Sequence, residues 1–294
     1  MEIAQALVDG IRFGLLIAMA AVGLSLIYGT TRLINFAHGE LVTMGAVIAW
    51  YLESGPTRLW LVVSVLCAAV LVGAFGGLLE RCLWQPLRAR RTGLFQLLII
   101  SLGLSFVLRY VMLIIFGGSS RSYREYSVQK TMHLLVLDIT PRDLTLVAIS
   151  ILVLVSVGLM LQRTAIGQAM RAVADNRDLA ESSGVDVKRV ILSVWVLGAG
   201  LAALGGAMLG VSDDVSWDMG FQMLLLVFAG VILGGLGTAY GAMVGGLLIG
   251  IVTQMSTLVF PPEMKVLWAL VILVLVLLVK PEGVLGRAQL KRVG

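Results

Sequence analysis

The chain is a succession of long apolar runs that recur from its first residues to its last. Each run is roughly 17 to 23 residues long, which is the length a helix needs to cross the hydrocarbon core of a bilayer. Charged residues make up only 13% of the sequence, whereas a soluble domain carries about a quarter. The sequence therefore predicts an all-α, polytopic transmembrane bundle that forms a single domain over residues 1–294.

We expect eight or nine membrane spans. The nine candidate segments are 11–29, 34–52, 59–79, 94–116, 143–161, 190–210, 222–236, 239–259 and 264–280. Segment 34–52 contains Asn35, His38 and Glu40, and segment 222–236 is short and runs into GGLG. Either could be broken or re-entrant, which is tolerated only where the exposed backbone is buried in protein or lines a wet cavity. The sequence leaves the choice between eight and nine spans open.

Lysine and arginine in short loops mark the cytoplasmic side of a membrane protein. With nine spans, three basic segments fall on one side: Arg81, Arg88, Arg90 and Arg91; Arg163, Arg171, Arg177, Lys188 and Arg189; Arg287, Lys291 and Arg292. The opposite loop 211–221 has three acids and no basic residue. We therefore expect an external N-terminus and a cytoplasmic C-terminus. Loop 117–142 conflicts with this topology, because it should be external yet contains four basic residues.

Several other classes of protein are disfavoured by the sequence. The two histidines are far apart, and neither H-E-x-x-H nor G-x-S-x-G occurs, so an intramembrane enzyme is not expected. The net charge of +5 is explained by basic cytoplasmic loops without any nucleic-acid binding. Cys67 and Cys82 are too few for a disulfide framework, and we expect free thiols. The N-terminus lacks the basic region of a cleaved signal peptide.

Glycine is the second organising signal, with 34 residues that cluster inside the apolar segments. Gly237, Gly241 and Gly245 repeat the small-xxx-small spacing that lets helix backbones approach closely. Glycine-interrupted short segments occur in both halves of the chain, at 29–39 and 230–241. Such pairing favours two pseudo-repeats around a central pathway, although no residue-level repeat is visible.

One polar segment, residues 162–189, separates two apolar spans. Ile166, Ala169, Met170 and Val173 share one face at helical spacing. Asp175 is placed to cap a second short helix, with Asp178 three residues later and Gly184 at the end. The mixed charge of the segment argues against a helix that only floats on anionic headgroups. We expect two short amphipathic helices that form a docking surface for another protein.

This segment resembles the cytoplasmic coupling segment of permease subunits of branched-chain amino acid ABC importers. Its Asp178-Leu179-Ala180, followed by three residues and then Gly184, is a degenerate form of the importer pattern Glu-Ala-Ala-x-x-x-Gly. The stretches that resemble the same family elsewhere are INFAHGELVTMGA at 34–46, FAGVILGGLGTAYGAMVGGLLIG at 228–250 and KPEGVLG at 280–286. The similarity extends over nearly the whole chain.

The resemblance implies a membrane-spanning transport subunit that has no ATPase site of its own, in a bacterial inner membrane. Two cytoplasmic ATPases would carry the ATP and Mg²⁺, a second homologous permease would complete the pathway, and an external binding protein would deliver the solute. The absence of a G-x-x-x-x-G-K-[ST] phosphate loop agrees with this expectation. The residues expected to couple to the ATPases are Ile166, Gly167, Met170, Arg171, Val173, Asp175, Asn176, Asp178, Ala180 and Gly184.

Polar residues at membrane depth are costly and are candidates for the substrate pathway. They are Asn35, His38, Glu40, Gln96, Ser101, Ser105 and Arg109. A zwitterionic amino acid needs one partner for its carboxylate, for which Arg109 is suited, and an acid for its ammonium. A purely structural role is the alternative for each residue, with Arg109 bridging helices and Asn35 or His38 capping a broken helix.

The sequence thus favours a permease that moves branched-chain or related amino acids inward by alternating access. An ABC permease for urea, amides or another small polar solute is the alternative within this class. A channel or secondary transporter that works without ATP is the alternative outside it. Secondary transporters commonly place acids deep in a span, whereas the clear mid-span charge here is the cation Arg109.

Overall fold

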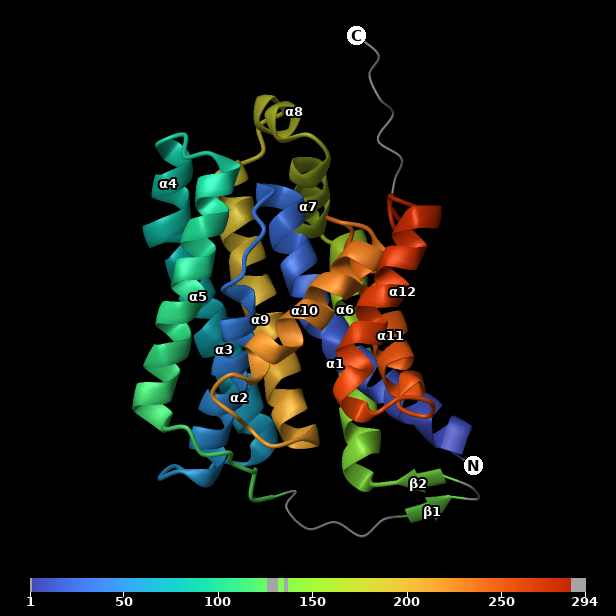
Figure 1. Ribbon diagram of the computed structural model, residues 1–294. Helices are drawn as coiled ribbons and strands as arrows, with labels where there is room; N and C mark the ends of the chain where they lie inside the picture. The colour runs from blue at the N-terminus through green and yellow to red at the C-terminus, as the bar shows by residue number, and fades with distance from the viewer. Residues whose placement is uncertain (1, 126–131, 135–136, 287–294) are drawn as a thin grey trace.

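The computed structural model describes residues 2–125, 132–134 and 137–286, which form one bundle of helices (Figure 1). The N-terminus and the small hairpin β1–β2 lie at one end of the bundle, and α4, α7 and α8 lie at the other. We call these the hairpin end and the α8 end. The helices are α1 (Glu2–Thr31), α2 (His38–Ser54), α3 (Leu61–Leu79), α4 (Gln85–Ala89), α5 (Leu94–Phe116), α6 (Pro141–Arg163), α7 (Ala165–Asp175), α8 (Arg177–Ser182), α9 (Val187–Ser212), α10 (Met219–Gly234), α11 (Ala239–Ser256) and α12 (Lys265–Val279). The strands are β1 (Met132–Leu134) and β2 (Leu137–Ile139).

The all-helical membrane bundle is confirmed, and each of the nine candidate segments overlaps a helix. In the described part of the chain, seven helices are long and apolar enough to cross a membrane by length and composition. They are α1, α3 with its continuation through a π-helical turn to Ala89, α5, α6, α9, α11 and α12 with its preceding turn. The two segments flagged as irregular from sequence become the short helices α2 and α10, of 17 and 16 residues.

Both short helices follow a non-helical segment that enters the bundle. Segment 32–37 precedes α2, so the candidate span at 34 begins four residues too early. Asn35 explains the break, because its side-chain oxygen accepts the N–H of Ala37 at 3.1 Å and its carbonyl accepts the N–H of His38. Segment 213–218 precedes α10 in the same way at the opposite end.

The two halves of the bundle have the same sequence of elements and run in opposite directions (Figure 1). In one half, α1 rises from the hairpin end and is followed by segment 32–37, α2, α3 and α5. In the other, α9 descends from the α8 end and is followed by segment 213–218, α10, α11 and α12. The pseudo-repeat is therefore present, but 32–37 corresponds to 213–218. The predicted partner 230–241 is wrong, because it spans the turn from α10 to α11.

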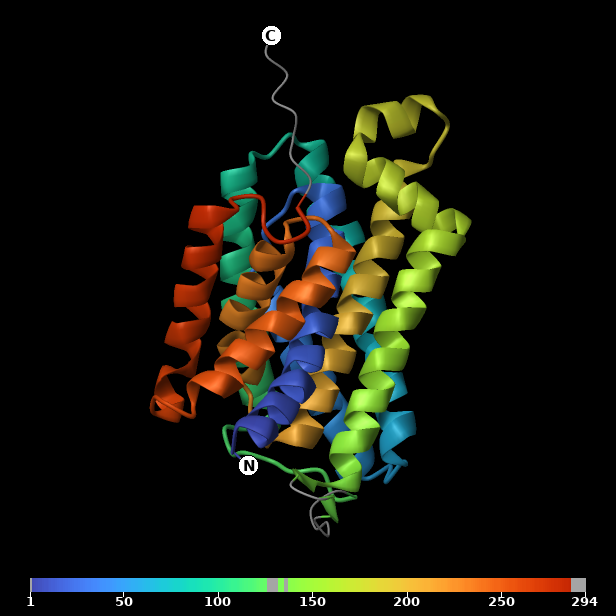
Figure 2. The same ribbon diagram turned by 90° about the vertical axis from the view of Figure 1, so that its right-hand side faces the viewer.

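The long helices α1 and α9 form the centre of the bundle. They pack on each other, and α1 also packs on α11 while α9 packs on α3. Figure 2 shows α1 and α11 crossing the bundle at a slant between α6 and α12. Side chains from Leu16 to Val22 of α1 are completely buried. By contrast, α5 and α12 pack mainly on α2 and on α10–α11, and leave wide apolar faces uncovered by this chain.

Small residues make the close helix contacts, as expected in a membrane, where tight packing replaces the hydrophobic driving force. Gly241 and Gly245 of α11 lie against the backbone of Gly234 and Gly230 of α10, which confirms two of the three predicted glycine contacts. Gly237 instead lies in the turn before α11 with φ +80° and lets the chain reverse direction there.

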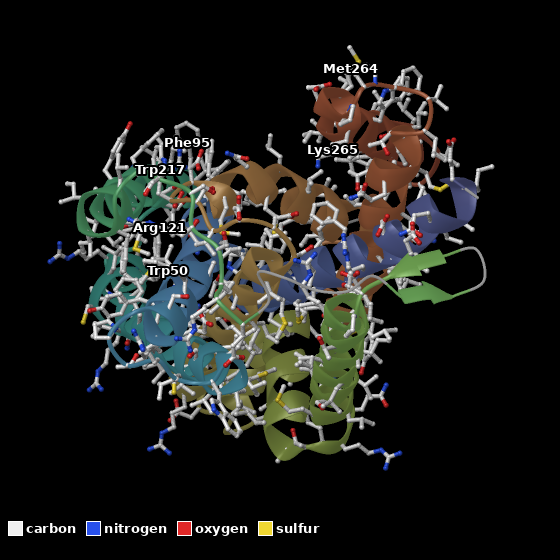
Figure 3. The ribbon with its side chains drawn as sticks, turned by 90° about the horizontal axis from the view of Figure 1, so that it is seen from below. Trp50, Phe95, Arg121, Trp217, Met264 and Lys265 are labelled. Carbon is white, nitrogen blue, oxygen red and sulfur yellow. The ribbon has the colours of Figure 1, made fainter. Side chains whose placement is uncertain are left out.

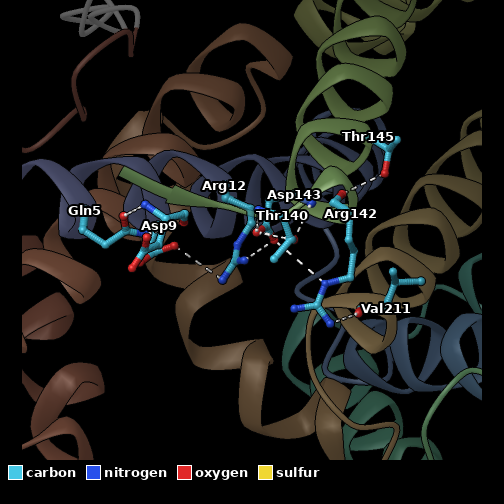
Figure 4. Close-up of polar contacts among 9 residues, drawn as sticks. Gln5, Asp9, Arg12, Thr140, Arg142, Asp143, Thr145 and Val211 are labelled. Atoms are coloured by element: carbon cyan, nitrogen blue, oxygen red, sulfur yellow. Dashed lines mark hydrogen bonds and ion pairs between the residues drawn. The ribbon is translucent and has the colours of Figure 1, made fainter. Parts of the chain in front are cut away.

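A polar network closes the hairpin end (Figure 4). Arg12 of α1 forms an ion pair with Asp143 at the start of α6, and Thr140 caps the same helix through Asp143. Arg142 donates to the carbonyl of Val211 at the end of α9 at 3.1 Å. These contacts join α1, α6 and α9 at the hairpin end.

Loop 117–125 is anchored to the ends of α2 and α9. Glu53 accepts the backbone N–H groups of Arg124 and Glu125, and Tyr123 donates to the carbonyl oxygen of Ala46 at 2.8 Å. Burial, and then the carboxylate of Glu53, raise the pKa of the Tyr123 phenol above its usual range, so the hydroxyl stays protonated and can donate.

The basic residues of this loop, which conflicted with the predicted topology, are partly accounted for by local contacts. Arg121 exchanges backbone hydrogen bonds with Val215, and its guanidinium lies 5.1 Å from the ring centroid of Trp50. Figure 3 shows Trp50, Arg121 and Trp217 together on one side of the hairpin end, away from Met264 and Lys265 of the α12 side. Lys130 lies outside the described residues.

The α10–α11 contact gives a direct test of the glycine packing. A Cβ at position 245 would overlap the carbonyl oxygen of Gly230, whereas a Cβ at Gly103, on the exposed face of α5, meets nothing within 4 Å. We expect Gly245→Ala to lower the free energy of unfolding by about 1–3 kcal/mol, and Gly103→Ala to leave it unchanged or slightly higher. Thermal unfolding of the purified protein in detergent measures both; equal melting temperatures for the two variants would contradict the packing argument.

Candidate functional site

The polar segment 162–189 folds as predicted into two short helices, α7 and α8, at one end of the bundle (Figure 1). Thr164 caps α7 by accepting the N–H of Gly167 at 3.1 Å. Met170 and Val173 are each 2% exposed, and α7 packs on α1, α6 and α9. The apolar face of this helix is therefore buried on three long helices of the bundle.

Close approach at Gly167 fixes α7 to the end of α6. A Cβ at this position would lie 2.5 Å from the Cα of Leu161 and would overlap the carbonyl oxygen of Met160. The C-terminal half of α7 is held from another side, because Arg32, just after α1, donates to the carbonyl of Ala174 at 3.3 Å. A displacement of α7 would therefore be transmitted to both α6 and α1.

Most of the remaining predicted coupling residues face outward. Arg171, Asp175, Asn176 and Asp178 are exposed. Ile166, which was assigned to the apolar face, is 41% exposed and lies near its edge. Ala180 of α8 is buried, and Leu179 beside it is 63% exposed. The segment thus presents a charged surface with two exposed aliphatic side chains to a partner.

The cap of α8 corrects one prediction. Asn176, not Asp175, caps this helix, and its side chain accepts the N–H of Leu179 at 3.1 Å. Asp175 is the last residue of α7, because the chain turns one residue later than the sequence pattern indicated. Gly184 follows α8 and has φ +85°, which is the left-handed conformation predicted for its position after a helix.

A cavity of about 520 Å³ separates α7 from the turn between α10 and α11. Arg171 and Asp175 line one wall, and Thr238 and Tyr240 line the other. The hydroxyl of Tyr240 donates to the carbonyl of Gly158 of α6 at 2.8 Å, which ties α11 to α6 below the cavity. The cavity leaves the outer side of α7 free to move relative to α11.

A second polar cluster lies inside the bundle, where α5 meets the start of α2. Arg109 donates from Nε and Nη2 to Oε1 of Glu40, at 3.0 and 2.8 Å. Ser105, one turn earlier on α5, donates to the same oxygen at 2.9 Å. Glu40 is completely buried and Arg109 is 7% exposed. The structure therefore brings together three of the residues that the sequence placed on the substrate pathway.

Three other candidates take part in local structure around this cluster. The side chain of Asn35 accepts the N–H of Ala37 just before α2, and Nε2 of His38 lies 2.9 Å from the carbonyl oxygen of Ala20 on α1. Ser101 of α5 accepts the N–H of Phe36 at 3.2 Å, and its hydroxyl lies 2.7 Å from the carbonyl oxygen of Leu98 and 3.2 Å from that of Ile34. These contacts hold segment 32–37 against α5.

Gln96 is not part of the cluster. Its side chain is exposed and accepts the N–H of Gly93 at 2.7 Å, which caps α5 at the α8 end. The 13 residues between Gln96 and Arg109 correspond to about 20 Å along a helix. The sequence could not separate a helix cap from a buried polar group here, because both occur within an apolar segment.

Two residues near the cluster had no recognisable signal in the sequence. The ring centroid of Phe221, at the start of α10, lies 3.5 Å from the guanidinium carbon of Arg109. Thr43 of α2 accepts the N–H of Gly220 at 3.0 Å, so the first turns of α2 and α10 touch. An aromatic residue in an apolar run is indistinguishable from lipid-facing residues until the packing is known.

Among the described residues, no three His, Cys, Asp or Glu side chains are grouped closely enough to hold a metal ion. Both cysteines are free thiols, as predicted, with Cys82 exposed and Cys67 partly buried. The candidate sites of this chain are therefore a surface for a protein partner at the α8 end and a charged cluster within the bundle.

Comparison with known proteins identifies the family. The family described as "Branched-chain amino acid transport system / permease component" matches residues 6–277. The high-affinity branched-chain amino acid permease LivH of Escherichia coli is 30% identical, with 98% of this chain and 97% of LivH covered. BraD of Pseudomonas aeruginosa has the same identity and coverage. A probable LivH of Methanocaldococcus jannaschii is 30% identical over 92% of this chain and 89% of the relative.

No solved structure matches the chain. The family match and the relatives nonetheless extend over nearly its full length, and this family consists of transport subunits that lack ATPase activity of their own. The resemblance seen in the coupling segment and in the glycine-rich stretches is therefore confirmed. The chain belongs to the permease component family of branched-chain amino acid ABC importers.

Proposed function

We propose that this chain moves branched-chain amino acids inward by alternating access, driven by ATPase subunits that bind at the α8 end. The observation that carries the proposal is the geometry of α7. Its apolar face is buried on α1, α6 and α9, while Arg171 and Asp175 on its outer side remain exposed. A helix held in this way can be displaced by a partner, and its displacement would move the long helices on which it packs.

The proposed motion follows the contacts of α7. Binding of ATP would close the two motor subunits against α7 and α8 of each permease. Because α7 is fixed to α6 at Gly167 and to the end of α1 through Arg32, its displacement would tilt these helices. The path between two permeases would then open to one side at a time. The cavity between α7 and α11 provides room for this movement.

We infer that the complete transporter contains several other chains. Two ATPase subunits would supply the ATP and Mg²⁺ sites, and an external binding protein would deliver the amino acid to the hairpin end. A second homologous permease would face the apolar surfaces that α5 and α12 leave uncovered, and lipid would cover the rest. The single-domain organisation over residues 1–294 and the pathway residues near Glu40 belong to the same proposal.

The proposed orientation places the α8 end in the cytoplasm. The exposed basic residues Arg81, Arg90, Arg91, Arg163, Arg171, Arg177, Lys188 and Arg189 all lie on elements at this end. The tail residues Arg287, Lys291 and Arg292 lie outside the described residues. Asp213 and Asp214 are exposed at the hairpin end. Arg58, Arg121 and Arg124 are exposed at the hairpin end, so the α8 end carries the excess of exposed basic residues rather than all of them. This excess supports a cytoplasmic α8 end under the positive-inside rule.

Coupling is tested by reversing charge on α7. The double change Arg171→Glu with Asp175→Arg should lower substrate-stimulated ATP hydrolysis by the assembled transporter about tenfold, equivalent to about 1.4 kcal/mol of lost interaction. Arg90→Glu is the matched control, because Arg90 is an exposed cation at the same end but outside α7. Insertion into membranes should be normal for both variants. An equal loss of activity in both would show that α7 has no specific part in coupling.

Orientation is tested with single cysteines in a background that lacks Cys67 and Cys82. Ser183→Cys lies at the α8 end and Asp214→Cys at the hairpin end, and both positions are exposed. A membrane-impermeant maleimide added to intact spheroplasts should label position 214, and should label position 183 only after the membrane is opened. The reverse pattern would place the α8 end outside and would exclude a cytoplasmic motor at α7.

Transport itself is tested in proteoliposomes that contain this chain, its permease partner, the ATPases and the binding protein. We expect uptake of leucine, isoleucine or valine that requires ATP hydrolysis. Uptake by this chain alone, at the same rate without ATP, would instead support a channel or secondary transporter. ATP-dependent uptake of urea, an amide or a sugar without uptake of amino acids would support a different solute for the same machinery.

A further inference from the structure

We propose that Glu40 and Arg109 form an intramembrane binding site for an α-amino acid zwitterion. The free carboxylate oxygen of Glu40 would accept the ammonium group, and the guanidinium of Arg109 would bind the carboxylate. This inference rests on the proposed function, since it names the groups with which the permease itself recognises its substrate.

The first observation is the uneven use of the Glu40 carboxylate. Arginine and carboxylate groups frequently pair through two parallel hydrogen bonds that use both oxygens. Here Nε and Nη2 of Arg109 and Oγ of Ser105 all donate to Oε1. Oε2 is buried and has no hydrogen-bond partner among the described residues. A buried carboxylate oxygen without a donor is costly, and an ammonium group is the donor that satisfies it best.

The second observation is the position of this oxygen at a junction of two broken helices. Glu40 lies in the first turn of α2, whose Gly39 packs against Gly220 in the first turn of α10. The partial positive charges of both helix N-termini therefore point into the same region. Glu40 balances this charge in the first turn of α2, and Asp218 immediately precedes α10. Membrane transporters commonly bind charged substrates where broken helices meet.

The third observation is a partly exposed ring over the cluster. Arg109 is covered by Phe221, whose ring stacks on the guanidinium and is 39% exposed. For a ligand to reach the guanidinium, Phe221 would have to rotate away; the ring of Phe106 lies further off, with its centroid 5.4 Å from the guanidinium carbon. Two exposed aliphatic residues lie on the elements that meet here: Ile34 in the segment before α2, and Leu225 one turn after Phe221 on α10. In the proposed site they would provide an apolar surface for the side chain of a branched-chain amino acid.

The charge balance selects the class of ligand. Breaking a buried ion pair is strongly unfavourable when either charge is left alone. A zwitterion avoids this penalty, because its two charged groups replace the two partners that separate, and the site keeps its neutral total charge. Binding of a carboxylate takes the guanidinium of Arg109 away from Oε1 of Glu40, so the pair separates in the proposed complex. In that separated state an amine would leave Arg109 unpaired, a carboxylic acid would leave Glu40 unpaired, and a neutral solute such as urea would replace neither charge. The pair therefore favours an amino acid over each of these solutes.

The alternative is that the ion pair only fastens α5 to α2. This possibility is concrete, because α5 packs mainly on α2 and buries Leu97, Ser101, Ser105, Arg109 and Met112 along one stripe. A fastening role requires that the two side chains bind each other, but not that they are charged. A binding role requires both charges. The two roles are therefore separated by a pair of side chains that keeps the hydrogen bonds and removes the charges.

The test compares Glu40→Gln, Arg109→Gln and the double variant in the complete reconstituted transporter. Each single variant should lower ATP-dependent leucine uptake at least tenfold. The double variant should recover the melting temperature lost by the single variants, because two neutral amides can bond to each other, yet its uptake should stay at least tenfold low. The control is Arg12→Gln with Asp143→Asn, which removes another ion pair far from α5 and should keep uptake within about twofold of wild type.

Recovery of leucine uptake in the double variant would overturn the inference and assign the pair to fastening alone. Absence of ATP-dependent uptake by the wild-type complex would instead remove the proposed function, so the two failures are distinguishable.

A second measurement is independent of stability. Photo-leucine, which carries a diazirine and both charged groups, should crosslink to residues 34–46 or 219–225 in the vanadate-trapped complex. The Glu40→Gln variant should lower this crosslinking at least fivefold; equal crosslinking in the variant and in wild type would also overturn the inference.

Discussion

The requirement that every backbone polar group inside a membrane finds a partner governs this structure. Segments 32–37 and 213–218 are non-helical and enter the bundle, so their N–H and C=O groups depend on other elements. Ser101 of α5 serves the first segment by accepting the N–H of Phe36, and its hydroxyl lies 2.7 Å from the carbonyl oxygen of Leu98 and 3.2 Å from that of Ile34. Backbone exchange between Arg121 and Val215 serves the second. These contacts satisfy part of the backbone of the segments after which α2 and α10 begin.

Because α2 and α10 begin there, the centre of the protein has an unusual combination of properties. Two helix N-termini meet through glycine contacts, and a buried acid and a buried arginine lie beside them. The same contacts make α5 a distinct part of the bundle, since it is joined to α2 along a stripe that includes Ser101, Ser105 and Arg109. The polar residues that stabilise the broken helices thus include the pair that we propose as the substrate site.

Segment 162–189 has the opposite arrangement at the α8 end. There, apolar contact fixes α7 to α1, α6 and α9, and the polar face is left exposed. The central helices α1 and α9 connect the two regions, because α1 contacts α7 near one end and the carbonyl of its Ala20 meets His38 of α2 further along. A displacement of α7 and a change in the charged cluster would therefore both act on α1 and α9.

The sequence by itself determined the class of fold, the position of nearly every helix, the irregularity of two segments and the two short helices of segment 162–189. These features depend on hydropathy and periodicity within about 20 neighbouring residues, so no folding is needed to recognise them. Only the tertiary structure decided that Glu40 meets Arg109, 69 residues away, and that Phe221 covers the guanidinium of Arg109. It also decided that Gln96 is a cap and that 213–218 is the counterpart of 32–37. Such pairings arise from the packing of distant helices, which no local pattern of residues records.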